Sequence, residues 1–279
     1  MALEDCIIMD ERLPLVMSVT SGKGGVGKTN ISANLAYSLA RQGKRVILLD
    51  ADLGLANVDI VLGVSPQRNL FHLFHEGATL EDILFPTPYG FSILPASSGV
   101  ADMISLTTGQ KLELLEAMDA LEEHIDYLIV DTGAGINDNV LYFNLAVQER
   151  LVVMTPEPTS LTDAYALIKV LTLQHDVERF RILVNMAPSE KEAKEVYARL
   201  AKACDHFLAG VSLDLVGCIP HDPLVKKAVM RQEPVCSAYP DSQAAQSLQK
   251  LAKDIATWNP AANLDGNIKF FWKKLLFHA

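Results

Sequence analysis

Continuous apolar runs alternate with amphipathic runs along most of the 279-residue chain. Runs such as Val46-Ile47-Leu48-Leu49 contain no polar position, which is typical of strands buried on both faces of a parallel sheet. The strands predicted in this way are Leu15–Thr20, Arg45–Asp50, Phe91–Pro95, Tyr127–Asp131, Leu151–Thr155, Arg181–Asn185 and Leu213–Ile219. The predicted helices are Thr29–Arg41, Gly109–Glu123, Asp138–Val147, Thr159–Gln174, Glu190–Phe207 and Asp241–Trp258. This alternation predicts an α/β fold, a mostly parallel β-sheet flanked by helices on both faces.

The pattern changes after Trp258. Residues 259–267 contain Pro, Gly, Asn and Asp, which favour turns and linkers. Residues 268–279 are again rich in aromatic and aliphatic side chains, now mixed with lysines. We therefore expect one domain over residues 1–258, a linker over 259–267 and a C-terminal amphipathic helix over 268–279.

Composition and charge narrow the functional classes. Hydrophobic residues make up 49% of the chain and charged residues 21%, values that rule out wholesale disorder. The net charge is −10, which argues against a protein whose main activity is nucleic-acid binding. Acidic residues interrupt the N-terminus where a secretory signal would be apolar, and no apolar run is as long as a membrane span. These features predict a cytoplasmic protein with reduced thiols.

The cysteines and histidines form no recognisable metal site. The four cysteines include no CxxC pair, so we expect neither an iron–sulfur cluster nor a zinc site of standard spacing. His72 and His75, with the adjacent Glu76, suggest a metal site, but no further ligand lies nearby in the sequence. They favour a structural pair at a helix end over a metal site.

The strongest chemical signal is a glycine-rich loop after the first predicted strand. Gly22, Gly27, Lys28 and Thr29 match the pattern G-x-x-x-x-G-K-[ST]. Glycines let successive backbone N–H groups face an anion, the lysine reaches the β- and γ-phosphates, and the hydroxyl ligates Mg²⁺. The helix that follows presents its positive N-terminus to the phosphates. The residues expected to bind ATP or ADP here are Gly22, Lys23, Gly24, Gly25, Val26, Gly27, Lys28, Thr29 and Asn30.

Lys23 extends this pattern to K-G-G-V-G-K-T, the deviant Walker A motif. Through it the chain resembles the MinD/ParA family of P-loop ATPases. The resemblance implies the P-loop NTPase fold, ATP and Mg²⁺ as cofactors, and an ATP-dependent homodimer in which Lys23 reaches the phosphates held by the partner subunit. It also implies that Lys23, Lys28 and Asp52 are the catalytic residues.

Two predicted strands end in aspartates, at the sheet edge where open α/β sheets bind ligands. The run D-A-D-L-G-L-A-N-V-D resembles the family's switch I, which implies that Asp52 orients the attacking water and that Asp50 lies beside the Mg²⁺ and phosphate network. Either aspartate is also suited to capping a helix or turn. Asp131 resembles the Walker B aspartate, and Gly135 resembles the switch II residue whose N–H contacts the γ-phosphate. The implied Mg²⁺ residues are Thr29, Asp52 and Asp131.

Two further segments resemble the part of the family that binds the base. Asn185 ends a predicted strand and corresponds to a residue that hydrogen-bonds adenine. Pro220 and Asp222 belong to an I-P-x-D run that resembles the loop lining the base pocket. Asparagine at a strand end is also a common turn former, so the residues alone leave both interpretations of Asn185 open.

The C-terminal segment has the pattern of an interfacial amphipathic helix. Its apolar face and flanking lysines predict peripheral binding to anionic lipid on the cytoplasmic face of the inner membrane. The same apolar side chains are also suited to docking on the protein itself, and the two states are compatible if they alternate with the bound nucleotide. The residues expected to contact the membrane are Ile268, Phe271, Trp272, Lys273, Leu275 and Leu276.

The switch I run is most similar to the FlhG (FleN) branch of the family, which restrains flagellar number. That resemblance implies slow, partner-stimulated ATP hydrolysis, with an FlhF-type GTPase, flagellar C-ring proteins and a flagellar transcriptional activator as partners. Residues 1–12 are short and acidic, unlike the usual activator segment of this branch, which puts FlhF stimulation in doubt. A MinD-type ATPase of division-site selection and a ParA-type DNA-partitioning ATPase are the alternatives.

Overall fold

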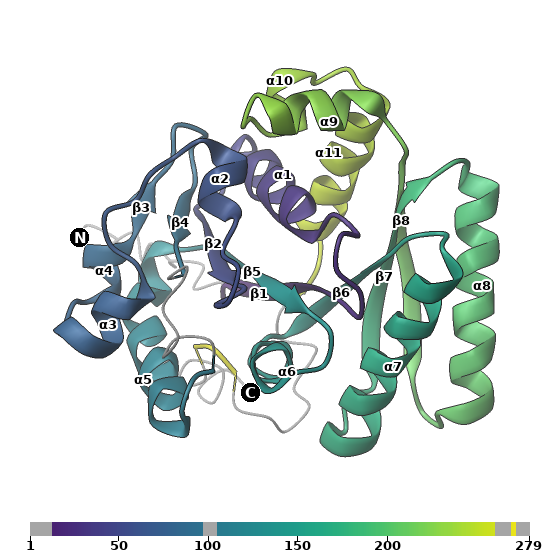
Figure 1. The fold of residues 1–279 in the computed structure, drawn as a ribbon, viewed down its shortest axis with the longest axis horizontal. Coiled ribbons are helices and arrows are strands. Elements are labelled where there is room, and N and C mark those ends of the chain that lie inside the picture. Colours follow the sequence, from purple (N-terminus) through teal and green to yellow (C-terminus); the bar gives the residue numbers. More distant parts are fainter. Residues whose placement is uncertain (1–12, 97–104, 260–268, 272–279) are drawn as a thin grey trace, which may run out of the picture.

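The computed structural model describes residues 13–96, 105–259 and 269–271, without the side chains of 122–124. These residues contain one eight-stranded sheet in the order β3-β4-β2-β5-β1-β6-β7-β8 (Figure 1). The strands are β1 (Leu15–Ser21), β2 (Val46–Ala51), β3 (Phe85–Pro86), β4 (Ser92–Leu94), β5 (Tyr127–Ala134), β6 (Glu149–Met154), β7 (Arg179–Ala187) and β8 (Ser212–Pro220). Neighbouring strands are parallel except β3 and β4. The expected mostly parallel α/β fold is confirmed.

The six predicted helices are present, and several short ones are added. The helices are α1 (Lys28–Ala40), α2 (Val58–Leu62), α3 (Leu70–Glu76), α4 (Leu80–Ile83), α5 (Thr108–Met118), α6 (Asp138–Leu145), α7 (Pro158–His175), α8 (Glu190–Phe207), α9 (Pro223–Met230), α10 (Val235–Ala238) and α11 (Gln243–Ile255). The helix predicted over Gly109–Glu123 becomes a 3₁₀ segment at Asp119–His124. Helices α2, α3, α4 and α10 are too short to show a helical period, so the pattern does not predict them; α9, with eight residues, was also not predicted.

Alternate residues of the central strands pack on opposite faces of the sheet. In β2, Leu48 belongs to the core under α1 and α11, whereas Ile47 and Leu49 belong to the core under α5 and α6. Helices α7 and α8 cover the opposite face from α11 at the other end of the sheet (Figure 1). Because both faces are covered, the strands are apolar at nearly every position. This is why the hydrophobic pattern predicts them so well.

The described part of the C-terminal segment packs against α6. Phe270 and Phe271 are fully buried in the core under α5 and α6. The Phe270 N–H donates to Ala146 O at 2.9 Å, and Lys269 Nζ donates to Leu145 O, also at 2.9 Å. A lysine at the C-terminal end of a helix complements the exposed carbonyls there. Lys269–Phe271 is thus an anchor point on the protein itself.

This anchor differs from the predicted membrane helix in two respects. Phe271 has a φ of 59°, in the left-handed region, so a regular helix does not run through it. Its side chain is also buried in the protein, as in the docking alternative. Within the described residues, no helix is both long enough and apolar enough to span a membrane. The predicted linker beyond Asn259 lies outside the described residues, and so do Ile268, Trp272, Lys273, Leu275 and Leu276.

Candidate functional site

The sheet brings the P-loop and two aspartates to the same edge. The P-loop joins β1 to α1 in the middle of the sheet, and β5 lies between β1 and β2 (Figure 1). Asp50 of β2 and Asp131 of β5 are register partners, and Val19 of β1 lies opposite Asp131 on the other side. Because the three strands are parallel, their carboxyl ends meet at this edge, as expected for a ligand site.

Close packing explains two of the P-loop glycines. A Cβ atom at Gly22 would lie 2.0 Å from Asp163 O of α7, so no side chain fits there. Gly27 has a φ of 95°, and a Cβ atom on it would lie 2.5 Å from Asn185 Nδ2. That amide donates to Val26 O at 2.8 Å. The loop is therefore held from two sides, by α7 and by the end of β7.

Lys28 is a buried cation at the start of α1. Only 9% of the residue is exposed, and its Nζ donates to Ser21 Oγ at 3.0 Å. Burial lowers the pKa of Lys28, and the nearby Asp131 and Asp52 carboxylates partly oppose that effect. A desolvated cation of this kind interacts strongly with a phosphate group.

Asp131 is a buried carboxylate that shares hydroxyl donors with the P-loop helix. Ser32 Oγ donates to Asp131 Oδ1 at 2.9 Å. Burial raises the pKa of Asp131 to about 6, against the lowering effects of Thr29, Lys28 and Ser32. Its negative charge is thus incompletely compensated by the protein alone.

The Asp50 carboxylate accepts hydrogen bonds from the backbone of the loop that follows β2. Its two carboxylate oxygens accept hydrogen bonds from the N–H groups of Asp52 at 3.1 Å, Asn57 at 3.0 Å and Val58 at 3.1 Å. Burial, and then the neighbouring Asp131, raises its pKa to about 8. In this structure Asp50 therefore organises the turn before α2, which is the capping role that the residues themselves left open.

The residue set around Asp131 fits a magnesium ion. Carboxylate and hydroxyl oxygens are the ligands that Mg²⁺ prefers, and Thr29, Asp52 and Asp131 offer them around one P-loop. The raised pKa of Asp131 indicates that Lys28 does not fully offset the burial of this carboxylate, which leaves it suited to further positive charge. A divalent cation would supply that charge.

The two expected switch segments contact each other and the P-loop. A Cβ atom at Gly133 would lie 3.4 Å from Asp52 Oδ1, so the C-terminal end of β5 passes directly beside Asp52. The Gly135 N–H donates to Ser21 O at 3.0 Å. In this structure that N–H is occupied by Ser21 O, and its expected contact with a γ-phosphate stays a prediction. Burial raises the pKa of Asp52, opposed by the Leu55 N–H and by Lys28.

The residues expected to bind the base lie in two separate places. Asn185 lies against the P-loop, as described above, while Asp222 is the N-cap of α9. Asp222 Oδ1 accepts from the Leu224 N–H at 2.9 Å and Oδ2 accepts from the Ala244 N–H at 3.2 Å. Burial favours a higher pKa for Asp222, but these N–H donors outweigh it and lower the pKa. Its carboxylate thus ties α9 to α11.

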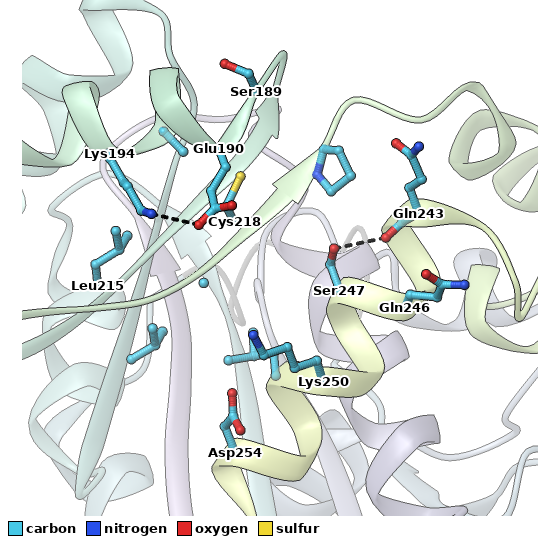
Figure 2. Close-up of a pocket in the computed structure, with 15 residues that line it drawn as sticks. Ser189, Glu190, Lys194, Leu215, Cys218, Gln243, Gln246, Ser247, Lys250 and Asp254 are labelled. Atoms are coloured by element: carbon cyan, nitrogen blue, oxygen red, sulfur yellow. Dashed lines mark hydrogen bonds and ion pairs between the residues drawn. The ribbon is translucent and has the colours of Figure 1, made fainter.

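Pro220 lines a groove of about 610 Å³ between α8, β8 and α11 (Figure 2). The groove is bordered by the ion pair between Lys194 Nζ and Glu190 Oε1, 2.8 Å apart, and by Lys250 and Asp254 of α11. None of the P-loop residues lines it. It is therefore separate from the phosphate site.

Lys23 differs from Lys28 in its surroundings. Its side chain is 34% exposed, and its Nζ pairs with the Glu157 carboxylate and donates to Thr159 Oγ1 at 2.9 Å. Both partners lie at the N-terminus of α7. In the single chain, Lys23 is therefore bound to its own subunit.

The motif does not predict four residues that contact Lys23, Lys28 or Asp131: Ser21, Ser32, Glu157 and Thr159. Ser32 could have been predicted from the sequence, because it lies one helical turn after Lys28 and so shares its face of α1. Ser21 directly precedes the motif. Glu157 and Thr159 carried no local signal, because they lie 134 and 136 positions from Lys23.

His72, His75, Cys204 and Cys236 have structural surroundings. His72 Nδ1 accepts from the Asn69 N–H at 3.2 Å in a capping box, and the ring of His75 stacks on Phe71 with centroids 4.5 Å apart. Among the described residues, no group of three or more His, Cys, Asp or Glu side chains is placed to hold a metal ion. Cys204 and Cys236 are buried, and burial raises the pKa of each thiol to about 11.

Comparisons with known proteins agree with this geometry. A family model described as ParA, NUBPL iron-transfer P-loop NTPase, matches residues 13–256. The antiactivator FleN of Pseudomonas aeruginosa is 47% identical over 263 residues, covering 94% of each chain. The flagellum site-determining protein YlxH of Helicobacter pylori is 35% identical, covering 93% of this chain and 89% of YlxH. The septum site-determining protein MinD complexed with Mg-ADP from Pyrococcus horikoshii superimposes with a TM-score of 0.73 at 27% identity, covering 88% and 97% of the two chains.

Proposed function

The chain belongs to the ParA family of P-loop NTPases, and from this premise we propose that it is a MinD-like ATPase that regulates flagellar number or placement. ATP drives its homodimerisation and its association with an anionic membrane, and hydrolysis releases it. The observation that supports this most directly is the pair of P-loop lysines, one buried beside the aspartates and one exposed at the rim. The likeness to FleN and YlxH supports the flagellar role.

The chemistry that this site favours is transfer of a phosphoryl group to water. Such a reaction depends on positioning and charge neutralisation more than on covalent catalysis. Mg²⁺ held by Thr29 and Asp131 would neutralise phosphate charge. Lys28 and the loop N–H groups bind the same phosphates, and Asp52 accepts a hydrogen bond from the attacking water and orients it. The chain supplies one orienting carboxylate, so basal turnover is slow and open to stimulation by a partner.

The docked C-terminal anchor supports a membrane switch. Phe270 and Phe271 are buried while Lys269 Nζ caps α6, so this part of the segment is withheld from lipid in the single chain. We expect the ATP-bound dimer to release the segment. One short helix binds a membrane weakly, but two copies in a dimer bind far better by avidity.

The membrane step is tested by sedimenting the full chain with vesicles of anionic or neutral lipid. The expected result is pelleting with anionic vesicles and a non-hydrolysed ATP analogue, and no pelleting with ADP. Trp272→Ala weakens this pelleting, whereas the control Leu173→Ala, at an apolar residue 61% exposed on α7, leaves it unchanged. Equal pelleting in both nucleotides, or insensitivity to Trp272→Ala, would contradict the membrane step.

The flagellar role is tested in the source bacterium by replacing the native copy with Lys28→Met. Cells are expected to carry more flagella than the wild type, because the variant no longer binds nucleotide productively. Flagella are counted by electron microscopy, with variant protein levels confirmed by immunoblot. Unchanged flagella together with misplaced division septa would instead favour the division-site alternative. Pull-downs with an FlhF-type GTPase, C-ring proteins and a flagellar transcriptional activator would then identify the partner.

A further inference from the structure

Ser32 joins the P-loop helix to the strand that carries Asp131. It lies on α1, after Thr29, the last position of the P-loop pattern. Both Ser32 and Asp131 are buried, and Ser32 Oγ lies 2.9 Å from Asp131 Oδ1. The two residues are 99 positions apart in the chain, so only the packing of β5 against α1 brings them together.

The Ser32 hydroxyl has one proton and two acceptors within reach. One acceptor is Lys28 O, one helical turn back on α1, at 3.0 Å, and the other is the Asp131 carboxylate. A hydrogen bond to a charged acceptor is stronger than one to a carbonyl, so the proton favours Asp131. The hydroxyl of Ser32 is therefore a donor to the carboxylate.

This contact ties Asp131 to the helix that carries the other phosphate-site groups. Lys28 and Thr29 form the start of α1, and Ser32 follows in its second turn. Because Asp131 comes from the sheet, its carboxylate needs a contact with α1 to keep a fixed orientation relative to them. A donor that orients a metal-binding carboxylate in this way commonly accounts for about 10- to 100-fold in metal affinity.

We propose that Ser32 is a positioning residue for Mg²⁺, whose hydroxyl holds the Asp131 carboxylate in the orientation that receives the cation. This inference rests on the proposed function, because it requires that the site bind a nucleotide together with Mg²⁺. Ser32 acts through Asp131 and touches neither the nucleotide nor the cation. Loss of its hydroxyl therefore weakens Mg²⁺ binding, whereas the contacts of Lys28 and the loop N–H groups with phosphates remain.

Ser38 provides a matched control on the same helix. It is also buried, with 5% of the residue exposed, and its Oγ has no hydrogen bond of standard geometry among the described residues. Ser38→Ala removes the same atom from α1 as Ser32→Ala does, but it leaves Asp131 untouched. Any general effect of replacing a buried helical serine by alanine is therefore common to the two variants.

The test is the binding of a fluorescent ADP to the full chain, read by anisotropy while Mg²⁺ is titrated. Ser32→Ala should raise the Mg²⁺ concentration at half-maximal binding about tenfold. Ser32→Cys keeps the side-chain volume but has only a weak S–H donor, so it should raise this concentration by a similar factor. Ser38→Ala should leave it unchanged. In EDTA, the wild type and all three variants should bind ADP with the same affinity.

Three results would overturn the positioning role. The first is a wild-type Mg²⁺ concentration at half-maximal binding in both Ser32 variants. The second is a wild-type value in Ser32→Cys alone, because the volume and not the hydroxyl would then matter. The third is a loss of ADP affinity in Ser32→Ala that is equal with Mg²⁺ and in EDTA, which a purely structural role would produce.

Failure of the proposed function gives a different result. A wild type that binds no ADP, or binds it equally with and without Mg²⁺, would contradict the nucleotide site itself, and the role of Ser32 would fall with it. A wild type that needs Mg²⁺, with variants that match it, would overturn only the role of Ser32. Circular dichroism confirms that each variant is folded.

Discussion

Lys23 and Lys28 belong to one loop, but they experience opposite physical conditions. Lys28 is 9% exposed and lies beside two buried carboxylates, so its surroundings are fixed by the fold of one chain. The Lys23 side chain is 34% exposed and is bound by residues that solvent also reaches. The buried half of the site is thus built to bind nucleotide, whereas the exposed half is suited to exchanging partners. In the proposed ATP-dependent dimer, dependence on a second subunit enters through the exposed half.

The largest expected effect is the loss of the buried cation. In Lys28→Met, ATP hydrolysis should fall by about 1,000-fold, because preorganised charge in a dry site contributes that much to phosphoryl transfer. Phosphate release from the full chain with Mg²⁺ and ATP measures it. Lys44→Met, at a lysine outside the site, is the control. A loss smaller than about tenfold would mean that Lys28 does not face the transferred phosphate.

The second-largest expected effect is the pH dependence of stability that the buried Asp131 carboxylate causes. Asp131 has a folded pKa of about 6, above its ordinary value, so the folded chain binds more protons than the unfolded chain between about pH 4 and 6. The contribution of Asp131 to stability therefore falls as pH rises through this window, by roughly 3 kcal/mol. Asp131→Asn removes that loss.

Urea unfolding of the nucleotide-free chain measures this difference. Asp131→Asn should be more stable than the wild type at pH 8 and nearly equal to it at pH 4, although it is inactive. Adding Mg²⁺ and ADP should narrow the gap at pH 8, because the ligand supplies the missing positive charge. A difference of the same size at both pH values would show that packing, and not ionisation, separates the two proteins.

The smallest effect is expected from Lys23→Met on the single chain. Removing an exposed ion pair should change the free energy of unfolding by less than about 1 kcal/mol. The same substitution should abolish ATP-dependent dimerisation, so stability and assembly separate at this residue. Thermal unfolding and light scattering measure the two properties. A large loss of stability in Lys23→Met, or full dimerisation and hydrolysis by this variant, would show that Lys23 and Lys28 do not have the different roles described above.

The sequence predicted most of the fold because the sheet is buried on both faces. Apolar runs such as Val46–Ala51 have no other stable environment, and the Gly-rich motif requires the strand–loop–helix in which it lies. Positions that depend only on near neighbours, such as those of Lys28 and Thr29 at the start of α1, were therefore predictable. The roles of Asp50 and Asp222 were harder to predict from the sequence. Both are carboxylates near motifs, Asp50 buried and Asp222 partly exposed, and only their backbone partners distinguish capping from ligand binding.

By itself the sequence determined seven of the eight described strands, the long helices and the phosphate-binding loop, because each depends on the chemistry of a few adjacent residues. Only the tertiary structure decided which distant groups meet. It paired Asp50 with Asp131 across neighbouring strands, joined Lys23 to Glu157, and packed Phe270 under α6. Contacts of this kind arise when the whole core closes, and the free energy that fixes them comes from burial shared among many residues.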